Sequence, residues 1–150
     1  GQAKAFRLKL EGIVRQAMAE HREPVVLVGW SLGGFIAREY AREHPKDVRQ
    51  VITLGSPVIG GPRYTATARR YRAQGHSLDQ LERDVKERYR TPLEVPVTAI
   101  YSKRDGVVAW QACIDRWSPN VEHVEVSETH VGLGFAPKVM QIIAEAIESG

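Results

Sequence analysis

The chain has 150 residues, with 21 Lys and Arg against 18 Asp and Glu, which gives a formal net charge of +3. This length suffices for one domain with a buried core, and so small a charge gives no indication of nucleic-acid binding. The single cysteine, Cys113, excludes a disulfide framework and a cysteine zinc site, and no apolar run is long enough to span a membrane. We predict that Cys113 packs as a small apolar residue.

The first elements are a helix, a short strand and a second helix. Apolar residues recur at helical spacing over residues 3–21, which predicts an amphipathic helix packed on a sheet. The residues expected on its buried face are Phe6, Leu10, Ile13, Val14, Ala17 and Met18. The apolar run at residues 25–28 predicts a strand, and residues 35–44, which end before a proline, predict a helix.

Between that strand and that helix lies Gly29-Trp30-Ser31-Leu32-Gly33. A G-x-S-x-G sequence in this context is typical of a nucleophile elbow, a strained turn that exposes the serine hydroxyl above the sheet edge. We expect a Cβ at Gly29 or Gly33 to collide with a neighbouring strand or helix. The backbone N–H of Leu32 would then stabilise an oxyanion formed at Ser31. An ordinary strand-to-helix turn is the alternative interpretation of the motif.

The second half continues the alternation after one interruption. Residues 48–54 predict a strand, and residues 58–94 then form a stretch too long and too polar for a simple crossover. Strands are predicted again at residues 95–101 and 121–127, followed by an amphipathic helix at residues 137–148. Strands that alternate with helices predict an α/β fold with a doubly wound, mostly parallel sheet.

Two further polar residues follow strand ends. Asp105 comes just after the strand at residues 95–101 and precedes a glycine, and His130 lies just beyond the strand at residues 121–127. The carboxyl ends of parallel strands meet at one edge, so Ser31, Asp105 and His130 would converge there. His130 would take the Ser31 proton, and Asp105 would orient the imidazole and stabilise the imidazolium. Asp115 is the alternative acid, and Asp105 as a simple turn former is the structural alternative.

The sequence resembles the α/β-hydrolase superfamily, in particular its bacterial esterase- and lipase-like branch. The resemblance is carried by GWSLGG at residues 29–34, TLGSP at 53–57, YSKRDGVV at 101–108 and THVGL at 129–133. It implies a partial α/β-hydrolase fold and ester, thioester or acyl-transfer chemistry through an acyl-Ser31 intermediate, without a metal or organic cofactor. It implies no particular substrate, because this fold hosts many chemistries.

The resemblance also implies a cap or lid over the serine, formed by the insertion at residues 58–94. Its many arginines favour anionic substrates or contact with an anionic lipid surface, and a solvated helical face is the alternative. Trp30, Tyr64 and Tyr71 are candidate substrate-binding residues; the two tyrosines could instead pin the lid to the core.

Relatives of this kind have several strands before the elbow, whereas one helix precedes it here. We therefore expect residues 1–150 to form a single domain truncated at its amino-terminal side, with the second oxyanion-hole donor absent from the chain. The strand at residues 25–28 would become an exposed edge, and we expect self-association through it. With no signal peptide visible and one cysteine, a cytoplasmic protein is expected.

Three functional hypotheses follow. The first is a serine hydrolase of carboxylic esters, an esterase or lipase, that acts on a small-molecule ester or lipid through Ser31, Asp105 and His130. The second is an acyltransferase or thioesterase of the same fold. The third is a catalytically incomplete fragment that self-associates.

Overall fold

The structure, a computed structural model, describes residues 2–58 and 91–150. The predicted cap at residues 58–94, with Tyr64 and Tyr71, therefore lies almost entirely outside the described residues. In chain order the described elements are α1 (Gln2–His21), β1 (Val25–Trp30), α2 (Leu32–Glu43), β2 (Val48–Leu54), β3 (Val97–Ser102), the 3₁₀ helix η2 (Trp110–Cys113), β4 (Val121–Val126), α5 (His130–Phe135) and α6 (Pro137–Ser149).

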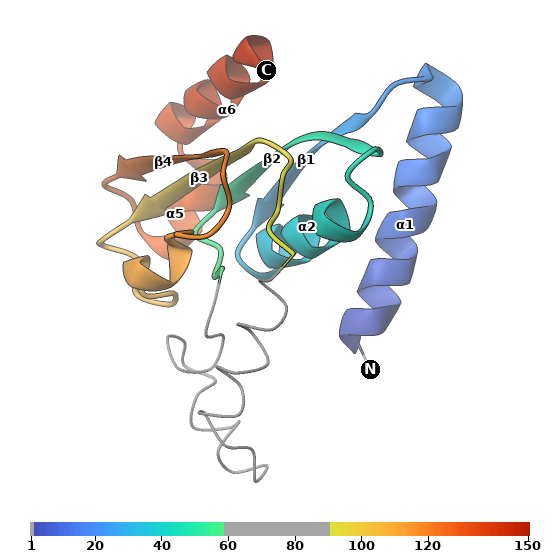
Figure 1. Cartoon of the computed structure of the whole chain (residues 1–150). Helices are drawn as coiled ribbons and strands as arrows, with labels where there is room; N and C mark the ends of the chain where they lie inside the picture. The colour runs from blue at the N-terminus through green and yellow to red at the C-terminus, as the bar shows by residue number, and fades with distance from the viewer. Residues whose placement is uncertain (1, 59–90) are drawn as a thin grey trace, which may run out of the picture.

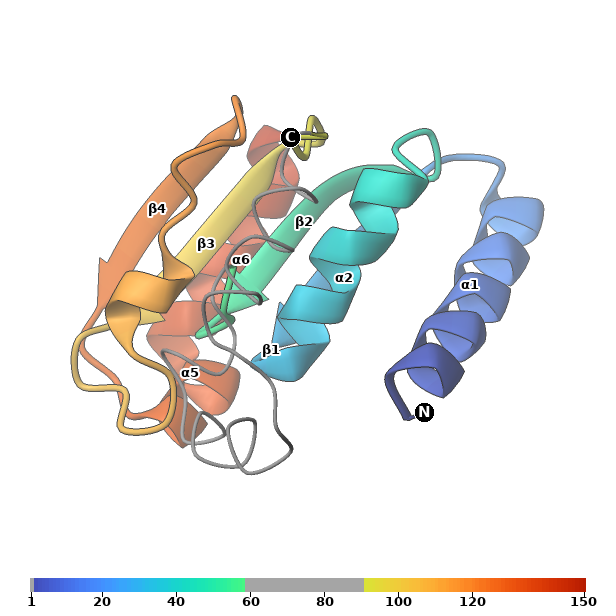
Figure 2. The same cartoon turned by 60° about the horizontal axis from the view of Figure 1, so that its bottom comes forward.

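The four strands form one parallel sheet in the order β1-β2-β3-β4. Helices α1 and α2 lie on one face of this sheet and α6 lies on the other (Figures 1 and 2). The prediction of a doubly wound, parallel α/β sheet is therefore confirmed. Because every strand runs the same way, the segments that follow the strands emerge along one edge of the sheet.

Each face of the sheet has its own apolar core. Neighbouring residues of a strand point to opposite faces, so Val51 of β2 belongs to the core under α2, and Ile52 belongs to the core under α6. Both side chains are fully buried. A central parallel strand is covered on both sides, which explains why every residue of β2 except Arg49 is buried.

Most predicted boundaries agree with the structure within three residues. Residues 48–54 form β2 as predicted, but α2 begins at Leu32 rather than at residue 35. Gly33 and Gly34 are poor helix formers, so the sequence pattern hides the first turn of α2. The short helices η2 and α5 were not predicted.

Helix α1 packs through a narrower stripe than predicted. Leu10 and Met18 pack against the core that contains Val14, whereas Phe6 and Ile13 are 57% and 58% exposed. The prediction that these last two residues are buried is wrong. The residues that pack are spaced four apart, and Ile13 lies about 100° around the helix from Val14.

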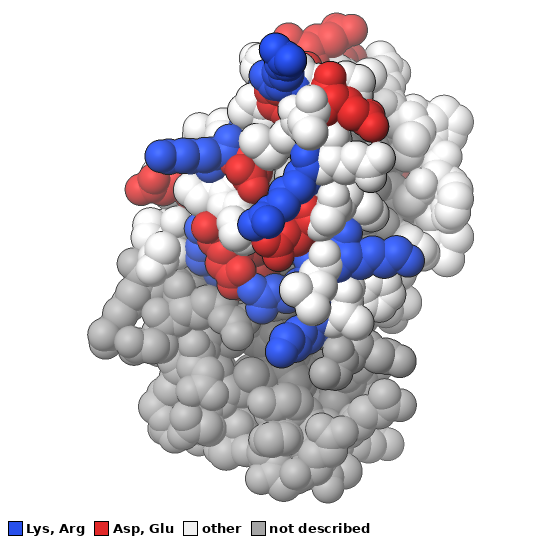
Figure 3. All heavy atoms as spheres, turned by 90° about the vertical axis from the view of Figure 1, so that its right-hand side faces the viewer, with Lys and Arg blue, Asp and Glu red and all other residues white. Residues whose placement is uncertain are grey.

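The outer side of the molecule beside α1 carries both signs of charge, interspersed over the surface (Figure 3). Arg7 of α1 pairs with Glu43 of α2, and Arg15 pairs with Glu11 one helical turn away. None of the helices within residues 2–58 and 91–150 is both long and apolar enough to cross a membrane.

Candidate active site

Ser31 forms by itself the turn between β1 and α2. Its backbone has φ 55° and ψ −125°, a conformation that side-chain-bearing residues rarely adopt and that costs about 1–3 kcal/mol. The surrounding structure holds it there, because the Ser31 N–H donates to the carbonyl of Leu54 at 2.8 Å and the Ser31 carbonyl accepts from Gly34 N–H at 3.1 Å. The strained turn has the geometry expected of a nucleophile elbow.

Close packing of the elbow depends on Gly29 and Gly34. A Cβ on Gly29 would lie 2.5 Å from the Gly34 Cα, and a Cβ on Gly34 would lie 1.9 Å from the Ser56 Oγ. A Cβ on Gly33 would meet nothing within 4 Å. The expectation for Gly29 is therefore confirmed and that for Gly33 is wrong. The glycine that this close packing requires is Gly34, the next residue along α2.

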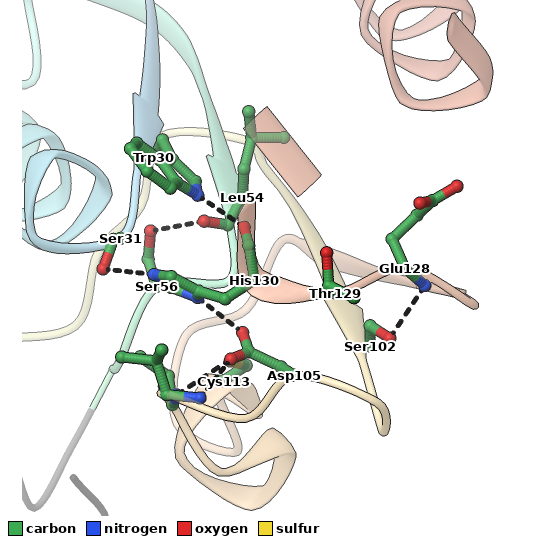
Figure 4. A network of polar contacts seen from close by, with 12 residues as sticks. Trp30, Ser31, Leu54, Ser56, Ser102, Asp105, Cys113, Glu128, Thr129 and His130 are labelled. Carbon is green, nitrogen blue, oxygen red and sulfur yellow. Dashed lines mark hydrogen bonds and ion pairs between the residues drawn. The ribbon is translucent and has the colours of Figure 1, made fainter. Parts of the chain in front are cut away.

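Ser31, His130 and Asp105 are brought together at the carboxyl edge of the sheet (Figure 4). The His130 Nε2 lies 3.0 Å from the Ser31 Oγ, and the His130 Nδ1 lies 2.8 Å from the Asp105 Oδ2. An ionised carboxylate can only accept, so Nδ1 carries the proton and Nε2 is free to accept the serine proton. The side chains of His130 and Asp105 are 10% and 1% exposed.

Backbone groups fix the Asp105 carboxylate from the side away from His130. Its Oδ1 accepts hydrogen bonds from the N–H groups of Val107 and Val108 at 2.8 and 2.9 Å. Oδ2 is thereby directed at the imidazole. The predicted turn after β3 thus forms a loop and also orients the Asp105 carboxylate.

Gly55 lies directly beneath the contact between Asp105 and His130. It has φ +57°, and a Cβ there would lie 2.9 Å from the Asp105 Oδ2 and 2.7 Å from the Leu133 Cδ1. Sequence reasoning did not assign it to the site. The available signal was a glycine immediately after a predicted strand, at the same sheet edge as the other candidates.

His130 is positioned by a helix start and by Trp30. It is the first residue of α5, whose N-cap residue Thr129 accepts from the Gly132 N–H at 3.0 Å. The Trp30 Nε1 donates to the His130 carbonyl at 3.0 Å, and the centroids of the two rings are 5.3 Å apart. Trp30, predicted to bind substrate, therefore contacts the histidine, and the residue remains 39% exposed.

Leu32, the predicted oxyanion-hole donor, is the first residue of α2. The first N–H groups of a helix have no acceptor within that helix. The Leu32 N–H therefore belongs to the positive end of the helix dipole, beside Ser31.

Asp115, the alternative acid, lies in a different network. Its Oδ2 accepts from Arg38 at 2.5 Å, and both side chains are fully buried. Burial opposes ionisation of Asp115, but hydrogen bonds from Ser118 and Arg38 outweigh it and lower its pKa to about 2. The interpretation of Asp115 as the acid that pairs with His130 is therefore wrong.

Cys113 is buried at 2% exposure, as predicted. Burial, and then the charge of Asp105, raise the pKa of its thiol to about 12, so it stays protonated. Within the described part of the chain, no group of three or more His, Cys, Asp and Glu side chains could hold a metal ion.

A family model described as the α/β hydrolase fold matches residues 13–76. A pimeloyl-[acyl-carrier protein] methyl ester esterase of Vibrio vulnificus is 31% identical over 85 residues, which cover 57% of this chain and 32% of that protein. The chain thus spans about a third of the length of this curated relative.

Two solved structures share the fold. One is an α/β hydrolase enzyme from the sediment metagenome of the Mar Chica lagoon, Morocco. It has a TM-score of 0.66 at 18% identity, and the superposition covers 98% of this chain and 70% of that chain. An α/β serine hydrolase homologue from Coxiella burnetii has a TM-score of 0.62 at 21% identity, with 91% of this chain and 56% of that chain covered.

Proposed function

We propose that this chain, whose fold is that of the α/β hydrolases and whose residues 13–76 match their family model, hydrolyses carboxylic esters through an acyl-serine intermediate. One observation carries the proposal. Asp105, His130 and Ser31 form a continuous relay of hydrogen bonds, at 2.8 and 3.0 Å, that ends at a strained serine. Strained backbone of this kind clusters at active sites, and a hydrogen bond to a neighbouring base is what activates a serine nucleophile.

In the proposed reaction, the Ser31 Oγ attacks the ester carbonyl carbon while His130 Nε2 takes the serine proton. Asp105 stabilises the resulting imidazolium, and the Leu32 N–H donates to the new oxyanion. The tetrahedral intermediate then collapses, and the departing alcohol takes the proton from His130. Water attacks the acyl-serine with His130 as base, which releases the carboxylic acid and restores Ser31.

A similar protein supports a carboxylic ester as the substrate, and one exposed residue supports a contact with it. The curated relative is named for the methyl ester of a pimeloyl group on an acyl-carrier protein, which is a carboxylic ester. In this chain Trp30 is 39% exposed and its ring centroid lies 5.3 Å from that of His130, so we propose that an acyl or alcohol group bound at Ser31 contacts the indole. We retain Trp30 as a substrate contact on this ground, alongside Tyr64 and Tyr71 outside the described residues.

Hydrolysis of a series of p-nitrophenyl esters, with analysis of the products, tests the proposal. We expect release of free acid by the chain and loss of at least about 10³-fold in rate for Ser31→Ala and for His130→Ala. His21→Ala, which changes an exposed histidine at the end of α1, should keep the full rate and serves as the control.

Adding methanol separates hydrolysis from acyl transfer. A hydrolase still forms mainly the free acid, whereas a dominant methyl ester product would favour the acyltransferase alternative. A folded chain that releases no acid from any ester would contradict the proposal and favour the incomplete-fragment alternative.

A further inference from the structure

One buried oxygen joins the loop that carries Asp105 to the loop that carries His130. Ser102 is the last residue of β3 and is 1% exposed. Its Oγ accepts from the backbone N–H of Arg104 at 3.1 Å and from that of Glu128 at 3.0 Å. Arg104 immediately precedes Asp105, and Glu128 lies two residues before His130.

The position of Ser102 explains why this contact matters. Ser102 pairs with Val126 in the register of β3 and β4, so the two loops leave the sheet side by side. Beyond Val126 the strand pairing ends, and the loops are free to diverge unless other groups hold them. A hydroxyl oxygen has two lone pairs, and here both are directed to backbone N–H groups, one from each loop. Figure 4 shows Ser102 bonded to Glu128 on the side of the site away from Ser31.

An exposed contact between the same two loops provides a natural comparison. The Arg104 Nη1 lies 3.4 Å from the Ser127 Oγ at the surface. This bond is long and solvent-accessible, so water can replace it without moving the backbone. No such replacement is available where the protein interior excludes water. The buried Ser102 contact is therefore the one able to set the distance between the loops.

We propose that Ser102 is a positioning residue that sets the geometry between Asp105 and His130. The inference rests on the proposed function, because it assigns Ser102 to the same relay. Ser102 acts through the backbone and touches neither the substrate nor the reacting atoms. Its loss would let the two loops separate, lengthen the bond between the Asp105 Oδ2 and the His130 Nδ1, and slow the chemical step without weakening substrate binding.

The test compares Ser102→Ala, Ser102→Cys and Ser102→Thr with Ser127→Ala. Ser102→Ala removes the acceptor, Ser102→Cys keeps nearly the same shape but is a weak acceptor, and Ser102→Thr keeps the hydroxyl. The first readout is the proton NMR resonance of the His130 ring N–H that donates to Asp105. This readout requires a folded chain but no activity.

We expect Ser102→Ala and Ser102→Cys to move this resonance upfield and broaden it, and Ser102→Thr and Ser127→Ala to leave it near its original position. In the ester assay, kcat should fall about 10- to 100-fold in the first two variants, with KM unchanged within about twofold. If Ser102→Ala does not fold, the resonance and the kcat of Ser102→Cys test the positioning role.

The two hypotheses fail in different ways. A chain that shows the resonance and its dependence on Ser102, but hydrolyses no ester, overturns the proposed function and leaves the positioning role in place. Folded Ser102→Ala and Ser102→Cys variants with unchanged resonance and unchanged kcat overturn the positioning role. A rise in KM at constant kcat also overturns it.

Discussion

Gly33 and Gly34 are neighbours in the sequence, but their surroundings at the elbow differ completely. Gly34 faces Ser56, two residues after the end of β2, so its missing side chain allows α2 to approach the sheet. Gly33 faces open space. The position of the Ser31 hydroxyl therefore depends on a glycine outside the G-x-S-x-G pattern itself.

This difference predicts opposite effects of alanine at the two positions. Gly34→Ala should lower the free energy of unfolding by about 1–3 kcal/mol, because the new methyl group overlaps Ser56 and displaces the elbow. Gly33→Ala should be neutral or raise it by up to about 1 kcal/mol, because alanine favours the helix. Urea denaturation of both variants measures the difference. Equal destabilisation by the two substitutions would contradict this account of the elbow.

The sequence indicates some residues of the candidate site and conceals others for a physical reason. Ser31, Asp105 and His130 each follow a predicted strand, and strand ends are visible as local patterns. Gly55 and Ser102 matter only through atoms brought to them from other strands and loops, and no local pattern records such contacts. The catalytic roles of Ser31, Asp105 and His130 are predictions that the activity measurements test.

At the level of elements, helix α2 is tied to the segment before β4 by a buried ion pair. The Arg38 guanidinium and the Asp115 carboxylate are both fully buried, and Asp115 also accepts from the N–H groups of Trp117 and Ser118. The Asp115 N–H donates to the His123 Nε2 at 3.0 Å, which adds β4 to the network. The elbow helix is thus connected to the strand that leads to His130.

Removal of the carboxylate should destabilise the fold strongly. Asp115→Asn leaves the Arg38 charge buried without a counter-ion, and we expect a loss of about 3–5 kcal/mol in the free energy of unfolding. Glu43→Gln breaks the exposed pair with Arg7 and should cost no more than about 1 kcal/mol. Similar losses in the two variants would contradict the claim that the buried Arg38–Asp115 pair matters more for stability than the exposed Arg7–Glu43 pair.

The same network predicts a loss of stability in acid. The pKa of Asp115 is about 2 in the folded chain, below its ordinary value of 3.8, so the unfolded chain binds its proton first as the pH falls. The contribution of Asp115 is complete above about pH 4 and is lost between about pH 4 and pH 2. Thermal melts across this range should show a steeper decline for the unmodified chain than for Asp115→Asn. Parallel declines would contradict the assignment to Asp115.

Element length determines which elements could be predicted. The strands and long helices contain enough residues for the spacing of their apolar residues to show a period, so the sequence predicts them. Helix α5, with six residues, and η2, with four, are too short for a period to emerge. The start of α5 did have a local signal, a threonine in the N-cap position.

At the level of the whole molecule, the parallel sheet gathers the candidate site at one edge and leaves a strand edge at its side. Within the described residues, β1 pairs with β2 and with no other strand. Val28 of β1 is 47% exposed. An apolar strand with one unpaired edge is a template for another strand, so we propose that copies of the chain associate through β1.

Light scattering coupled to size-exclusion chromatography tests this association. We expect a mass above that of one 16.8 kDa chain, and a shift towards the monomer for Val28→Lys, because a charged edge strand resists pairing. Met140→Lys places the same charge at an exposed residue of α6, outside the β1 edge, and should not change the mass. A monodisperse monomer of the unmodified chain would contradict the proposal.

Reaction with a fluorophosphonate probe, mapped by mass spectrometry, tests the central claim most directly, because the probe requires an activated serine but no knowledge of the substrate. The account predicts one adduct, on Ser31, that disappears in Ser31→Ala and falls at least about 10³-fold in rate in His130→Ala. The adduct should persist in His21→Ala. A folded chain that is not labelled, or is labelled at another residue, would contradict the account.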